Sequence, residues 1–151
     1  MKTGTIAAVI AALLALALAL GGCGGGDDTT ALTRAEYLKQ ADAICKEGLD
    51  ERTVLFKKAN VNIDPNKELS DSAKEKLVLA VILEPYEKST DQLKELSAPD
   101  GEEEKVEALI KAREKSAEEV SEKPLVAVTS IEQFENSNKL SMQYGLKECD
   151  V

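Results

Sequence analysis

Apolar residues are distributed along this chain in two ways, and the change between them divides the sequence into two parts. Residues 6–20 form one uninterrupted apolar run behind a charged amino terminus. Beyond residue 31 the apolar residues recur at intervals of three and four, with polar residues between them. That spacing places apolar side chains on one face of an α-helix. Because no segment alternates convincingly like a strand, the pattern predicts an all-α domain over residues 32–151.

Two long helices are predicted in the first half of this domain. The first begins at a capping box that starts with Thr33 and runs to about residue 59. The second begins near Ser70 or Ser72 and keeps its helical spacing to about residue 96. Pro85 falls inside it and removes one backbone hydrogen bond, so we expect a kink there.

Two shorter helices are predicted in the second half. Asp100 is the expected N-cap of the third helix, and Pro124 ends it. Ser130, with Gln133 three residues later, is the expected cap of the fourth, and Gly145 is placed to end it in a left-handed conformation. The expected apolar stripe of the third helix consists of Val106, Leu109, Ile110, Arg113, Ala117 and Val120. Arg113 is its one charged member. The prediction is a kinked four-helix bundle-like domain.

The apolar run near the amino terminus ends in Leu20-Gly21-Gly22-Cys23, which is typical of the cleavage and acylation signal of a bacterial lipoprotein. Its 15 residues are fewer than the roughly 18 that a membrane-spanning helix needs. We therefore expect a signal peptide over residues 1–22, lipid attachment at Cys23, and a flexible tether over residues 23–31. The domain would then lie on the extracytoplasmic face of the cell membrane, held by acyl chains. An ordinary secretory cleavage site after the alternating alanines, or a plain membrane anchor, remains an alternative.

The net charge limits the class of partner, and the number of cysteines limits how they pair. The formal net charge is −9 and no basic cluster offsets it, which argues against nucleic acid as a partner. The chain has three cysteines. If Cys23 carries lipid, Cys45 and Cys149 remain as one pair in a compartment where disulfides persist. Two free thiols or intermolecular bridges are the alternatives.

The chain contains no histidine, which removes the usual general base and the commonest zinc ligand. The abundant carboxylates are expected on solvated helix faces, so we predict neither an enzyme nor a bound cofactor or metal. The loop over residues 60–71 has oxygen-bearing side chains at the spacing of a calcium-binding EF-hand loop. It lacks the first Asp, the central Gly and the final Glu of that loop, so a plain polar turn is favoured.

Several segments resemble small uncharacterised lipoproteins of actinobacteria. They are Ala35-Glu36-Tyr37, the run from Gln40 to Cys45, Pro85-Tyr86, the run from Leu96 to Pro99, and the ending from Tyr144 to Cys149. The resemblance implies an exported helical domain in which Cys45 and Cys149 are bridged. It implies no activity.

Function is therefore approached by elimination. We expect a non-catalytic binding or interaction module of the cell envelope, with an envelope protein or a wall component as its partner. The alternative is an accessory enzyme that uses carboxylates alone, such as a glycan hydrolase. Glu84, beside Pro85, is the one carboxylate expected near an apolar face.

Overall fold

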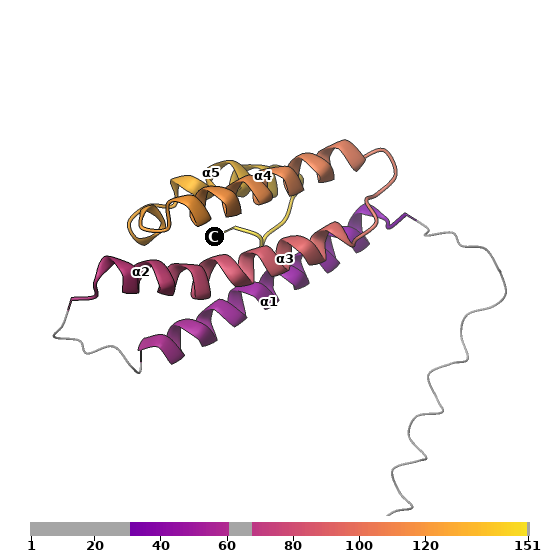
Figure 1. Ribbon diagram of the computed structural model, residues 1–151. Helices are drawn as coiled ribbons and strands as arrows, with labels where there is room; N and C mark the ends of the chain where they lie inside the picture. The colour runs from indigo at the N-terminus through magenta and orange to yellow at the C-terminus, as the bar shows by residue number, and fades with distance from the viewer. Residues whose placement is uncertain (1–30, 61–67, 151) are drawn as a thin grey trace, which may run out of the picture.

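The computed structural model describes residues 31–60 and 68–150, and all of their regular structure is helical. The elements are α1 (Arg34–Asn60), α2 (Asp71–Val78), η2 (Leu79–Leu83), α3 (Glu84–Lys94), α4 (Glu103–Glu122), η3 (Val126–Val128), η4 (Glu132–Phe134) and α5 (Glu135–Tyr144). Because α2, η2 and α3 follow one another without a break, they form one long helix. The predicted all-α, four-helix arrangement is confirmed. Figure 1 shows two layers, with α1 beside the α2–α3 helix in one and α4 beside α5 in the other.

The start of α1 is fixed by local hydrogen bonds, as the sequence predicts. The backbone N–H of Thr33 donates to Oε2 of Glu36 at 3.0 Å, and the backbone N–H of Glu36 donates to Oγ1 of Thr33 at 3.3 Å. These bonds satisfy donors that the first turn of a helix leaves free. The hydroxyl of Thr33 also donates to Oε2 of Glu36 at 2.6 Å, and this bond, together with that from the N–H of Thr33, holds the pKa of the Glu36 carboxyl below its ordinary value. Both reciprocal hydrogen bonds of the predicted capping box are therefore present.

The second helix accommodates Pro85 by widening for one turn. Ser70 is its N-cap, because Oγ of Ser70 accepts a hydrogen bond from the backbone N–H of Ala73 at 3.3 Å. Proline has no N–H, and its ring crowds the carbonyl four residues earlier. Just before it, residues 79–83 form a π-helical turn, in which the N–H of Glu84 reaches back to the carbonyl of Leu79. The expected kink thus takes the form of one π turn, after which the α-helix resumes.

The predicted cap of α4 is wrong. The N-cap position is held by Glu102 rather than Asp100, and no side chain caps it. Oε1 of Glu103 accepts from the backbone N–H of Gly101 at 3.1 Å. Gly101 has a positive φ of 75°, and this turn separates Asp100 from the first helical turn.

The start of the last helix also differs from the prediction. Oγ of Ser130 accepts from the backbone N–H of Glu132 at 3.1 Å, which starts the 3₁₀ turn η4, and α5 begins only at Glu135. The side-chain amide of Gln133 donates to the carbonyls of Glu119 and Lys123, at 2.6 and 3.3 Å. Gln133 therefore caps the end of α4 rather than the start of its own helix.

Two glycines have roles that the structure makes explicit. Gly145 has a φ of 101° and ends α5, as predicted. Its N–H donates to the carbonyl of Met142 at 3.1 Å, while the N–H of Leu146 donates to that of Ser141 at 3.0 Å, which together form a Schellman motif. A Cβ on Gly48 would lie 3.3 Å from the carbonyl oxygen of Pro85. Glycine in the middle of α1 therefore permits a close approach to α3.

The core consists of two apolar clusters separated by a polar layer. The first cluster contains Tyr37, Ala41, Cys45, Leu93, Val106, Leu109, Ile110, Tyr144, Leu146 and Cys149. The second contains Val78, Leu83, Tyr86, Ala117, Val120 and Phe134. Along α3 and α4 the residues between the clusters are buried but polar: Ser89, Thr90, Arg113 and Ser116. Within the described ranges, no helix is long and apolar enough to cross a membrane.

Candidate functional site

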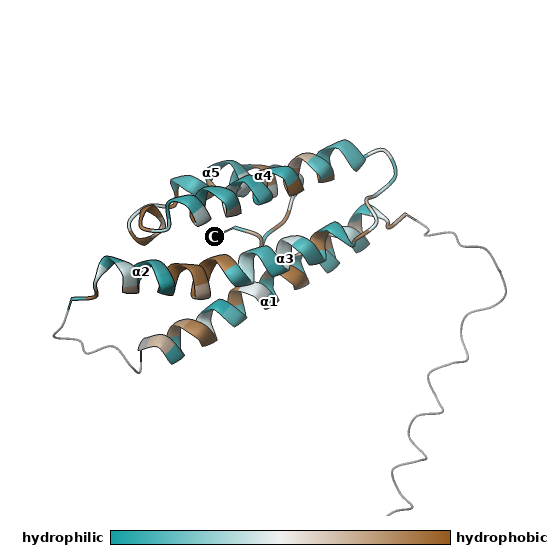
Figure 2. Cartoon of the chain, viewed as in Figure 1, coloured by the Kyte–Doolittle hydropathy of each residue, from teal (hydrophilic) through white to brown (hydrophobic). Residues whose placement is uncertain are grey.

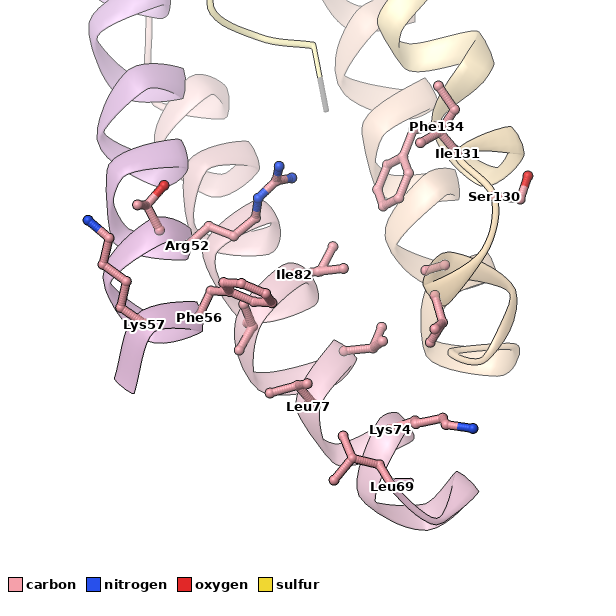
Figure 3. A pocket seen from close by; sticks show the side chains of 15 residues that line it. Arg52, Phe56, Lys57, Leu69, Lys74, Leu77, Ile82, Ser130, Ile131 and Phe134 are labelled. Carbon is pink, nitrogen blue, oxygen red and sulfur yellow. The ribbon is translucent and has the colours of Figure 1, made fainter. Parts of the chain in front are cut away.

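A groove of about 700 Å³ opens at the end of the molecule beyond the second apolar cluster. The carboxyl-terminal part of α1 and the α2–η2 segment border one side of it, and the η3–η4 connection borders the other (Figure 3). Its lining includes buried members of the core, among them Val78, Val81 and Phe134, which are 4%, 5% and 2% exposed. The groove therefore extends from the surface down to the second cluster.

The rim of the groove consists of apolar side chains that the fold leaves uncovered. Phe56 is 51% exposed, Val128 48% and Ile131 61%. Figure 2 shows apolar residues gathered at this end of the molecule, on η2 and on the connection between α4 and α5. The helical spacing predicts Phe56 and Ile131 on packed apolar faces, and that expectation is wrong. No described element lies close enough to bury either side chain.

Charged residues at the groove are all basic. Arg52, Lys57 and Lys74 contribute to the lining, and no Asp or Glu does so among the described residues. This contrasts with the whole chain, which carries 28 acidic residues against 19 basic ones. Lys74 forms two long ion pairs, with Glu68 at 3.5 Å and with Asp71 at 3.4 Å. Arg52 and Lys57 form no ion pair with any residue that the structure describes. The groove is thus apolar with a positive border.

A buried arginine organises the polar layer between the two apolar clusters. Arg113 is 2% exposed and donates to Oγ1 of Thr90 at 3.0 Å, to Oγ of Ser89 at 2.8 Å and to the carbonyl of Cys149 at 3.3 Å. Its guanidinium carbon lies 4.1 Å from the centroid of the Tyr86 ring, where a cation is attracted to the π face. Burial lowers the pKa of Arg113 from its ordinary value. All three nitrogens are used, so this arginine joins α3, α4 and the carboxyl-terminal tail.

The carboxyl-terminal tail is held against α1 by a disulfide and by backbone hydrogen bonds. Cys45 and Cys149, which are 104 residues apart in the sequence, are bridged, as predicted. Oδ1 of Asp42 accepts from the N–H groups of Lys147 and Glu148 at 2.8 and 3.1 Å. Figure 1 shows the tail running from α5 toward the layer formed by α1 and α3. The bridge is therefore one of several contacts that order these residues.

A further polar cluster joins the starts of α1 and α4 to the end of α5. Arg34 forms an ion pair with Glu102 at 2.6 Å, and the hydroxyl of Tyr144 donates to Glu102 at 2.8 Å. The hydrogen bond from Tyr144, reinforced by Arg34, holds the pKa of the Glu102 carboxyl below its ordinary value. Burial raises the pKa of Tyr144, and the neighbouring carboxylate raises it further. These contacts lie at the opposite end of the bundle from the groove and fasten its helices together.

The other sites considered from the sequence do not converge on the groove. Cys23 and the expected cleavage site lie outside the described residues, as does most of the loop over residues 60–71. Glu84 is exposed and does not line the groove. In the described ranges, no group of three or more Cys, Asp or Glu residues is placed to hold a metal ion. The sequence did not predict the groove, because helical spacing identifies Phe56 as part of an apolar face without showing whether another element covers it.

Comparison with known proteins gives no match: no family model, no curated protein and no solved structure is significantly similar to this chain. The resemblance to actinobacterial lipoproteins therefore depends only on the segments quoted above.

Proposed function

We propose that this protein is a membrane-anchored, non-catalytic binding module and that the apolar groove is its binding site. Anchoring through acyl chains on Cys23, at the extracytoplasmic face of the cell membrane, belongs to the same proposal. A groove of about 700 Å³ with a buried apolar floor and an exposed apolar rim is the observation that carries it. Ligand sites in proteins have volumes of roughly 300–1,000 Å³ and predominantly apolar linings.

The composition of the lining supports binding rather than catalysis. General acid–base catalysis needs a titratable group aimed at the reacting atoms, often paired with a second one. Among the described residues, the groove is lined by no carboxylate and no cysteine, and the chain has no histidine. The two hydroxyls in the lining, on Thr53 and Ser130, have no neighbouring base there to activate them. An apolar ligand held by burial fits this set of side chains.

The groove also explains why apolar residues are left exposed at this end of the bundle. Exposed apolar patches on a folded domain commonly mark interaction sites. Phe56, Val128 and Ile131 come from two separate parts of the chain and surround one opening. A ligand that filled the groove would cover these side chains and remove their apolar surface from water.

In-cell photo-crosslinking from the full chain tests the proposal. Ile131 is replaced by a photoreactive amino acid, and Met142, equally exposed at 61% but outside the groove, provides the control position. We expect a reproducible adduct from position 131 and none of the same mass from position 142. Val128→Glu should reduce this adduct, whereas Val54→Glu, at a matched exposure of 49% against 48%, should leave it unchanged. Equal adducts at both positions, or insensitivity to Val128→Glu, would overturn the assignment of the groove.

The anchoring is tested separately by the mass of the mature amino-terminal peptide. Acylation at Cys23 predicts a peptide that begins at that residue and carries fatty acyl groups, and the full chain should leave the membrane fraction when Cys23→Ser is introduced. An unmodified amino terminus at another position would contradict the anchoring without affecting the groove.

A further inference from the structure

We infer that the groove binds a small amphiphile with one apolar chain and an anionic head group, and that Arg52 binds the head group. This inference rests on the proposed binding function and specifies the chemistry of the ligand. It depends on the depth of the groove, on the distribution of charge around it, and on the position of Arg52 within it.

The depth of the groove favours a single alkyl chain over a helix of a partner protein. A helix is about 10 Å wide and lays only one face into a groove, so it reaches the floor only with single side chains. The groove also reaches buried residues such as Val81 and Phe134. An alkyl chain, which is narrower than a helix, can make contacts at that depth.

Charge complementarity favours an anionic head group. Every charged side chain that lines the groove within the described part of the chain is a cation, although the chain as a whole is acidic. A cation beside apolar surface is desolvated, and an anion brought by the ligand would compensate for this. Hydrogen bonds between a guanidinium and a carboxylate or phosphate are charge-assisted and can be bidentate. The same arrangement would disfavour a cationic amphiphile.

The position of Arg52 distinguishes it from the two lysines. Its side chain extends from α1 toward the groove, as Phe56 does one turn later (Figure 3). The side chain of Lys57 points away from the opening on the other side of α1, and Lys74 lies at the far end of the opening (Figure 3). Arg52 is partly buried and has no ion-pair partner among the described residues, whereas Lys74 is paired with two carboxylates. Arg52 is therefore the cation that extends into the groove and has no ion-pair partner among the described residues.

A second cavity indicates which end of the groove is polar. Arg52 and Ile82 also line an adjoining cavity of about 30 Å³ that reaches Arg113 in the polar layer. Glu148 and Asp150 line this small cavity too, but Arg52 forms no ion pair with either of them or with any other described residue. A head group at Arg52 would thus lie at the polar end of the groove. The chain would extend past the apolar side chains of η2 and α2, toward the segment 69–77.

The test uses the full acylated chain in lipid nanodiscs with two photoactivatable probes of the same length, palmitate and hexadecanol, each with a diazirine at the chain end. Adducts are mapped to individual peptides by mass spectrometry. We expect both probes to label the segment 69–77, and palmitate to label it more strongly. In Arg52→Gln, the ratio of palmitate to hexadecanol adducts should fall about tenfold, as expected for the loss of a charge-assisted hydrogen bond. Lys39→Gln, which removes an exposed charge from the same helix outside the groove, should leave the ratio unchanged.

Each other outcome has a distinct meaning. Equal labelling by the two probes, unchanged in Arg52→Gln, would overturn the anionic head group and leave the proposed apolar site intact. If neither probe labels the groove but position 131 gives a protein adduct in cells, the proposed amphiphilic ligand is overturned and the proposed binding function is kept. Labelling by neither probe and no adduct from position 131 would overturn both. A further expectation is that affinity rises about fourfold per methylene added to a short carboxylate until the groove is filled.

Discussion

The buried arginine of the polar layer provides the sharpest test of how this bundle is stabilised. Arg113 is 2% exposed, donates three hydrogen bonds, and has no carboxylate partner among the described residues. Two substitutions of similar length separate the contributions of its charge and its shape. Arg113→Lys keeps the charge but loses the planar fork, and Arg113→Met removes the charge but keeps much of the volume.

We expect the lysine variant to be the less stable of the two. A single ammonium cannot reproduce the directions of three guanidinium donors, and a buried charge that loses its partners costs about 3–5 kcal/mol. In Arg113→Met no charge is buried, and Ser89 and Thr90 keep their own hydrogen bonds to the carbonyl of Tyr86, at 2.9 and 2.8 Å. The main loss is then the donor to the carbonyl of Cys149, which costs about 1–3 kcal/mol and is partly offset by the removal of a desolvated charge.

The measurement is urea unfolding of residues 24–151 with the disulfide intact, followed by far-ultraviolet circular dichroism. Arg52→Lys is the matched control, because Arg52 is partly exposed and has no ion pair with a described residue. Its free energy of unfolding should stay within about 0.5 kcal/mol of the wild-type value. A lysine variant as stable as the wild type, or more stable than Arg113→Met, would refute the reasoning about the guanidinium geometry.

Three further predictions concern elements that hold the bundle together. Gly145→Ala should lower the free energy of unfolding by about 1–2 kcal/mol, since φ is 101° there; an unchanged urea midpoint would contradict this. Replacing Cys45 and Cys149 together by Ala should lower the free energy of unfolding by up to about 4.7 kcal/mol, because the bridge closes a loop of about a hundred residues. Calorimetry of the wild type and the double variant measures the difference. The pKa of the Glu102 carboxyl is lowered in the folded state, mainly by the hydrogen bond from Tyr144. The stabilisation that this carboxylate provides is therefore present above its ordinary pKa of 4.5 and is lost as the pH falls through its folded-state pKa. The melting temperature should therefore fall on acidification below about pH 4.5, and it should fall less steeply in Glu102→Gln; identical slopes would show that this carboxylate is not involved.

Local signals in the sequence determined where most helices lie and how some of them end. The capping box at Thr33 and the left-handed Gly145 each depend on residues within one turn of each other, so their hydrogen bonds follow from spacing alone. Spacing left Ser70 and Ser72 open as the N-cap of the second helix, and the structure shows that it is Ser70. The stripe on α4 was predicted correctly, including Arg113, because a period of three and four identifies a buried face. Counting cysteines was sufficient to propose the Cys45–Cys149 pair.

Only the tertiary structure decided which apolar residues are covered and what the buried polar groups contact. Helical spacing shows that a face is apolar, but burial requires another element to lie against it, and for Phe56 and Ile131 no described element does. Gln133 caps a different helix, and Arg113 reaches hydroxyls on α3 and a carbonyl in the tail, all distant in sequence. Such contacts depend on how the helices pack, which no local pattern specifies. The groove has the same origin, because it is the space that packing leaves between three separate segments of the chain.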